Sequence, residues 1–166
     1  MKVEYRFDPF EITGIEVPKD RRSEALKEVA SYVIEQVLTH MDNARSPVDG
    51  HGAFKALSKD YAKKKKAAGK GSRPNLEFYG DLKTAIQCTR SGGMLNLKVT
   101  GTESAKADGH CNHSGKSQLP TRRFIPLEGE DEGFKKSIVD GIEQVLKQYQ
   151  EKDRKSSDLD FRIELP

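Results

Sequence analysis

A stripe of apolar residues between Arg21 and Ala44 constrains the fold more than any other feature of this sequence. Its members recur at steps of three and four residues, the spacing of one face of an α-helix; they are Leu26, Val29, Val33, Val37 and Met41. A second stripe lies within residues 131–150 and consists of Phe134, Ile138, Ile142, Val145, Leu146 and Tyr149. Each stripe needs a partner to cover it, so we predict two long amphipathic helices around a shared core.

Other stretches carry the two-residue alternation of half-buried strands. Val3, Tyr5 and Phe7 alternate with charged residues, and residues 94–101 alternate in the same way after Gly92 and Gly93. We also predict a short strand over 11–17, an extended segment over 121–127, and a surface loop or short irregular helix over 102–118. The predicted fold class is α+β, with one small, mainly antiparallel sheet packed against the two long amphipathic helices and a long basic loop.

The length of 166 residues is that of one domain. We expect a single α+β domain over residues 1–150 and a C-terminal extension over 151–166. In the extension Leu159, Phe161, Ile163 and Leu165 alternate, which predicts a strand that pairs within the domain or with a neighbouring subunit. The apolar fraction is only 34% and the charged fraction is 33%, so we expect a small core and surface reserved for neighbouring subunits.

Several classes of protein are disfavoured by the same composition. No apolar run approaches the roughly 18 residues of a membrane span, and no apolar signal region follows the first charges, so we expect the chain to stay in the cytoplasm. The glycines around Lys70 lack the order of a phosphate loop. We find no enzyme signature and expect no cofactor.

Two weaker hypotheses concern the cysteines, Cys88 and Cys111, which we expect to be free thiols. His110, Cys111 and His113 lie close together, with Cys88 as a fourth candidate zinc ligand, but their spacing fits no standard structural zinc site. A hydrolase that uses Cys111 and His113 is the other hypothesis, which retained function in a Cys111→Ala variant would remove.

The most basic part of the chain lies between Ala56 and Ile86. Leu57, Tyr61 and Lys65 are spaced to form the inward stripe of a short helix, which Gly69, Gly71 and Pro74 end. The apolar cluster after it begins at Leu76 and continues with Phe78, Tyr79, Leu82 and Ile86. We predict a tethered basic loop that faces a neighbouring protein or DNA through Lys63, Lys64, Lys65, Lys66, Lys70 and Arg73.

The order of three short motifs resembles the tail-completion or virion-morphogenesis proteins of tailed bacteriophages, which act in head-tail joining. The first motif is Leu57, Ser58, Tyr61 and Lys65, and the second is Leu76, Gly80, Leu82 and Ile86. The third is Pro120, Arg122, Arg123, Phe124, Ile125 and Pro126. The resemblance covers roughly residues 46–150, whereas the tail after Gln150 departs from the family pattern.

The resemblance implies a structural neck protein of the virion, assembled in the host cytoplasm. Such a protein forms a ring, expected to be hexameric, that links the tail tube to the head connector as a tail-completion, tail-terminator or head-tail joining factor. Its partners would be copies of itself, the connector or adaptor protein and the tail tube protein, with Arg122, Arg123 and Phe124 as contact residues. Nonspecific contact with DNA in the lumen is compatible with the lysines. The alternative from another class is a small basic nucleic-acid-binding protein with no enzymatic activity.

Overall fold

The protein is an α+β structure with a small antiparallel sheet, as predicted, and the sheet has three strands. The structure is a computed structural model that describes residues 3–76, 81–111, 122–127 and 133–163. The strands are β1 (Glu4–Phe7), β2 (Ile86–Ser91) and β3 (Met94–Val99), in the order β1-β3-β2. The predicted strands over 3–7 and 94–101 are confirmed. β2 was not predicted.

β2 joins β3 through a tight turn at Gly92 and Gly93, and Gly92 has a φ of 63°, which glycine adopts without steric cost. Arg90 stands opposite Leu95 in this hairpin, so the two side chains share the face of the sheet that covers the core. A cation on the core face weakens the apolar alternation of β2. This is why residue pattern alone did not indicate the strand.

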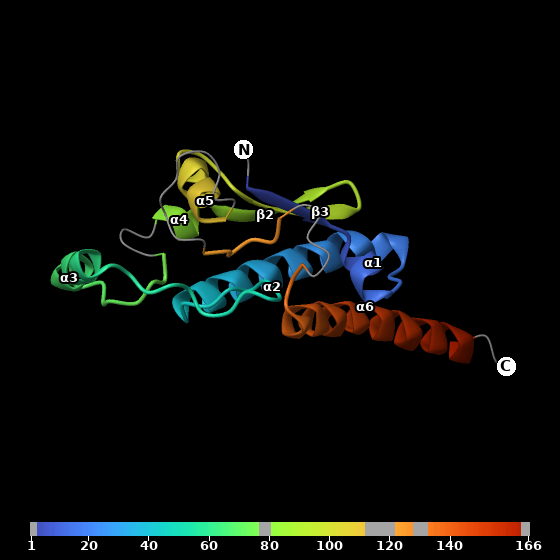
Figure 1. Cartoon of the computed structure of the whole chain (residues 1–166). Coiled ribbons are helices and arrows are strands. Elements are labelled where there is room, and N and C mark those ends of the chain that lie inside the picture. The colour runs from blue at the N-terminus through green and yellow to red at the C-terminus, as the bar shows by residue number, and fades with distance from the viewer. Residues whose placement is uncertain (1–2, 77–80, 112–121, 128–132, 164–166) are drawn as a thin grey trace.

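α2 (Arg22–Asp42) is the central layer of the molecule and confirms the long helix predicted over 21–44. It follows a short 3-10 helix, η1 (Lys19–Arg21). Figure 1 shows the sheet on one side of α2 and α6 (Lys136–Ile163) on the other. The core between these layers includes all the residues of the first predicted stripe, and from the second stripe it includes Phe134, Ile138, Ile142, Leu146 and Tyr149.

α6 departs from the prediction at both ends. It begins at Lys136 rather than at Asp131, and it continues to Ile163, so the strand predicted from Leu159 to Leu165 is wrong as far as Ile163; the last residues lie outside the described chain. Extending an existing helix adds one hydrogen bond for each residue fixed and needs no new nucleus. A four-residue alternation has no such advantage until a partner strand is supplied.

The short strand predicted over 11–17 is also wrong, because the chain forms α1 (Pro9–Thr13) there. The Asp8 carboxylate accepts a hydrogen bond from the Phe10 amide at 2.9 Å, and Pro9 occupies the first turn, where its missing N–H costs nothing. Gly14 ends the helix in the left-handed conformation. Local capping therefore outweighs the apolar pattern.

The remaining described elements are α3 (Lys59–Ala67), α4 (Asp81–Thr84) and α5 (Glu103–Cys111). α5 fulfils the helical alternative predicted within 102–118, although residues 112–118 lie outside the described chain. Residues 122–127 form no strand in the described part, but Phe124 and Ile125 are completely buried. No helix of the described residues is long and apolar enough to cross a membrane.

Candidate functional site

The basic arm, which we define as residues 59–76, is the most separate part of the described molecule. It consists of α3 and the loop that follows it. Figure 1 shows α3 beyond the C-terminal end of α2, held at the end of two irregular connections and apart from the sheet. Ser58 caps α3 by accepting a hydrogen bond from the Tyr61 amide at 3.3 Å, which helps a short helix to form away from the core.

Lys65 holds the arm together from inside. Only 2% of Lys65 is exposed, and its Nζ donates hydrogen bonds of 2.5 Å to the Arg73 carbonyl and to Asn75 Oδ1. Gly69 and Gly71, with φ of 74° and 70°, let the loop turn back far enough to supply these acceptors. The prediction that Lys65 faces DNA or a neighbouring protein is therefore wrong, because its charge is used within the arm.

The other predicted cations of the arm are on its surface. Exposed side chains are Lys63, Lys64, Lys66, Lys70 and Arg73, to which Lys59 adds a further charge. Tyr61, which was expected to point inward, is 44% exposed, and Leu57 is half-buried. Phe78 and Tyr79 of the predicted apolar cluster lie outside the described residues, whereas Leu82 and Ile86 are buried as expected. Such a surface can bind phosphate or carboxylate groups.

Arg122 fixes the root of the arm, which we define as residues 55–58 that lead into it, to the body. It is 5% exposed, and its Nε and Nη2 donate to the Lys55 carbonyl at 3.2 and 3.0 Å. Its backbone amide donates to the His110 carbonyl at 2.9 Å, which joins the root to α5. Burial lowers the pKa of the Arg122 guanidinium, and the nearby Tyr61 phenol opposes this. No residue pattern indicated these hydrogen bonds, because their acceptors are backbone carbonyls.

The residues predicted as partner contacts are therefore mainly interior. Phe124 is completely buried, Arg122 is bound to Lys55, and only Arg123 is half-exposed. The Arg123 Nε donates to the Cys111 carbonyl at 2.8 Å, and its own carbonyl accepts from Ser46 Oγ. The expectation that Arg122 and Phe124 form an exposed surface is corrected: in the folded chain they hold 122–127 against the core.

The cysteines show no arrangement for nucleophilic chemistry within the described residues. Cys111 is completely buried, and burial raises the pKa of the Cys88 thiol to about 12, so Cys88 is not a thiolate at neutral pH. His110 is 6% exposed, and His113 lies outside the described residues. In the part of the chain that the structure describes, no three His, Cys, Asp or Glu side chains gather as metal ligands.

Comparisons of this chain with protein-family models, with curated proteins and with solved structures found no match. The basic arm combines exposed cations with a root held by hydrogen bonds from the buried Arg122 side chain. This arrangement holds positive charges in a fixed place, where the anionic groups of another molecule can bind them.

Proposed function

We propose that this chain is a structural subunit of the neck of a tailed bacteriophage. It forms a ring, of six copies by our proposal, that links the tail tube to the head connector, and it has no enzymatic activity. The observation that carries the proposal is the basic arm, whose exposed cations stand apart from the three-layer body. The order of the three short motifs, which resembles that of head-tail joining proteins, supports a phage neck as the place where the basic arm makes its contact.

The build of the arm suits docking better than catalysis. Lys65 and Arg122 donate hydrogen bonds to backbone carbonyls of the same chain, and these bonds fix the loop after α3 and the root of the arm. The lysines around Lys65 are then presented outward on a supported surface. A preorganised surface loses less conformational freedom on binding than a free loop does, so it supports a stable contact with a neighbouring ring.

The sheet offers a route to ring formation. β1 and β2 are its outer strands among the described residues, so each has one side without a neighbouring strand in the sheet. The edge of a strand is a template for pairing with another chain. Repeated contacts between different faces of adjacent copies close into a ring when the rotation permits.

The exposed cations also favour a second function, that of a small basic nucleic-acid-binding protein with no enzymatic activity. Lys63, Lys64, Lys66, Lys70 and Arg73 can neutralise phosphates without reading base sequence. In the neck proposal the same residues contact a neighbouring ring or the DNA that passes through the lumen. The two functions differ in whether the folded unit assembles or binds DNA as a monomer.

Light scattering during size-exclusion chromatography, with negative-stain imaging, tests the proposal on the purified full chain. We expect ring particles over a range of protein concentrations, whether or not DNA is present. In parallel, fluorescence anisotropy with duplex DNA is measured between about 50 and 200 mM salt, the range over which phosphate contacts lose most of their affinity.

A variant in which Lys63, Lys64, Lys66 and Lys70 are all Gln is compared with a matched control. The control replaces four exposed lysines elsewhere, Lys27, Lys106, Lys136 and Lys147, by Gln. A monomer whose salt-dependent DNA binding is lost only in the arm variant would overturn the neck proposal and support the alternative. Rings that form regardless of DNA support the neck proposal.

A further inference from the structure

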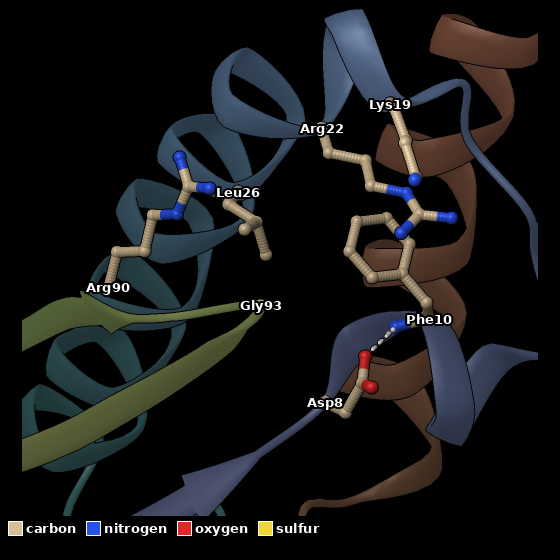
Figure 2. A pocket seen from close by; sticks show the side chains of 7 residues that line it. All are labelled: Asp8, Phe10, Lys19, Arg22, Leu26, Arg90 and Gly93. Carbon is tan, nitrogen blue, oxygen red and sulfur yellow. Dashed lines mark hydrogen bonds between the residues drawn. The ribbon is translucent and has the colours of Figure 1, made fainter.

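A cleft lies at the other end of α2 from the basic arm. It has a volume of about 470 Å³, within the usual range of small-molecule sites, and it is lined by Asp8, Phe10, Lys19, Arg22, Leu26, Arg90 and Gly93. Figure 2 shows Lys19, Arg22 and Phe10 on one side of the hollow, and Arg90 and Leu26 on the other. Four elements of the chain therefore supply its walls: α1, η1, the start of α2 and the β2–β3 hairpin.

Two of the three cations of the cleft, Arg22 and Arg90, are held in place, and none of the three is neutralised. Arg22 Nε donates to the Val17 carbonyl at 2.9 Å, and its guanidinium lies 5.4 Å from the centre of the Phe10 ring. Arg90 donates from Nε to the Gly92 carbonyl and from Nη1 to Ser23 Oγ, both at 2.8 Å. Within the described residues, no carboxylate forms an ion pair with Lys19, Arg22 or Arg90.

The charge balance of the cleft favours a doubly charged anion. Lys19, Arg22 and Arg90 bring three positive charges, and Asp8 brings one negative charge that is already used to cap α1. The start of α2 adds the positive end of the helix dipole. A phosphate monoester carries a charge of about −1.5 to −2 at pH 7 and has three acceptor oxygens, which match outward guanidinium and ammonium groups.

We propose that this cleft binds a phosphate monoester joined to a planar or apolar organic group. Lys19, Arg22 and Arg90 bind the phosphate, and the organic group packs on the half-buried ring of Phe10. Carboxylates fit less well, because each carboxylate group offers one charge and two acceptor oxygens, whereas a phosphate monoester gathers up to two charges and three acceptor oxygens on one centre. The proposal does not rest on the neck function, since no residue of the cleft belongs to the basic arm.

The test uses the full chain and three probes: adenosine monophosphate, inorganic phosphate and succinate. Binding is measured by isothermal titration calorimetry and by the Nε–Hε NMR signals of Arg22 and Arg90. We expect adenosine monophosphate to shift both signals and to bind more tightly than inorganic phosphate, with succinate the weakest. Equal affinity for adenosine monophosphate and inorganic phosphate would overturn the role of Phe10.

Substitutions locate the site. Lys19→Gln and Arg22→Gln each remove one charge, and each should weaken the binding of adenosine monophosphate by about tenfold or more, because hydrogen bonds to charged groups are worth about 1.5–3 kcal/mol. Lys19 makes no hydrogen bond or ion pair to another described residue, so its substitution should leave the fold intact. Lys27→Gln, on the same helix as Arg22 but outside the cleft, is the matched control and should bind as the parent does.

The outcomes separate this site from the arm. Binding that is lost in the arm variant but kept in Lys19→Gln would overturn the proposal and place the phosphate on the arm. No shift of the Arg22 and Arg90 signals at millimolar adenosine monophosphate would also overturn it. Succinate that binds as tightly as adenosine monophosphate would assign the cleft to an acidic peptide instead.

Discussion

Lys65 shows how one buried cation can organise a surface element. Its aliphatic stem is covered, and its ammonium group closes the loop through the Arg73 carbonyl and Asn75 Oδ1. Removing one partner of a buried polar pair leaves the other partner without its hydrogen bond, which costs more than the pair contributed. The loop after α3 therefore depends on a residue that contributes nothing to its exposed charge.

We predict that Lys65→Met loosens the basic arm without unfolding the body. Methionine matches the stem in length but offers no donor, so the acceptors in the loop lose hydrogen bonds worth about 1.5–3 kcal/mol to a charged donor. Limited trypsin digestion followed by mass spectrometry should show cleavage within residues 63–73 accelerated several-fold, with little change in the melting temperature. Lys64→Met removes one exposed trypsin site but no described anchor, so the other sites of the arm should be cleaved at the parental rate.

At this scale the sequence was informative only in part. The helical spacing placed Lys65 on the inward stripe, and the structure confirms this, although its charge had also suggested a place among the exposed cations. The same spacing placed Tyr61 inward, where the structure exposes it. Acceptors such as the Arg73 and Lys55 carbonyls exist at every residue, so no residue pattern reveals which one a cation will use.

Among the elements, α2 and α6 approach closely at Gly141. A Cβ atom added there would collide with the end of the Tyr32 ring, which lies across from it on α2. Glycine in a helix is unfavourable by about 1 kcal/mol relative to alanine, so its presence here is compensated by the close packing it allows. Tyr32 and Gly141 form one knob and one hole between the two layers.

We predict that Gly141→Ala lowers the free energy of unfolding by about 1 kcal/mol, because overpacking of about 1–3 kcal/mol outweighs the gain in helix propensity. In a Tyr32→Leu background the ring end is gone, and the same substitution should become stabilising by up to about 1 kcal/mol. Urea denaturation of the four proteins in a double-mutant cycle measures this reversal. Additive effects would contradict the contact. Gly52→Ala, in a loop where an added Cβ meets no atom within 4 Å, shows the effect of replacing a glycine without a collision and without a helix.

The elements that periodicity predicted are those whose apolar residues face a single core. α2, β1 and β3 belong to this group. The errors occur where another force decides the structure: the Asp8 cap turns 9–13 into a helix, and α6 propagates through the alternation after Gln150. β2 was missed because Arg90 turns from the core face into the cleft. The charge of Arg90 that obscured the strand is the charge that we propose binds phosphate in the cleft.

At the scale of the whole molecule, the contact between α2 and α6 makes the free energy of unfolding fall at high pH. Tyr149 donates a hydrogen bond of 2.5 Å to Glu28 Oε2, and this bond, with burial, raises the pKa of Tyr149 to about 12 from an ordinary value of 10.0. Burial also raises the pKa of Tyr32. A raised pKa means that folding favours the neutral phenol, so this stability is complete below pH 10 and is lost as the pH rises towards 12.

We predict that the free energy of unfolding, measured by urea denaturation, falls between pH 10 and 12. Tyr149→Phe should lose about 1 kcal/mol at pH 7, because the hydrogen bond to Glu28 is gone, and should show a shallower fall above pH 10. Tyr61→Phe, which changes an exposed tyrosine of the basic arm, should keep the parental slope. A slope in Tyr149→Phe equal to that of the parent would assign the alkaline loss to other groups.

The position of α2 between the basic arm and the cleft gives the molecule a fixed length scale. Its 21 residues span about 30 Å, and its packing against both the sheet and α6 keeps it from bending. A molecule bound at the basic arm and a phosphate bound in the cleft, as we propose, would therefore be held apart by a distance that the number of residues in α2 sets. The two proposed sites lie at opposite ends of α2, so a small ligand in the cleft does not overlap the basic arm.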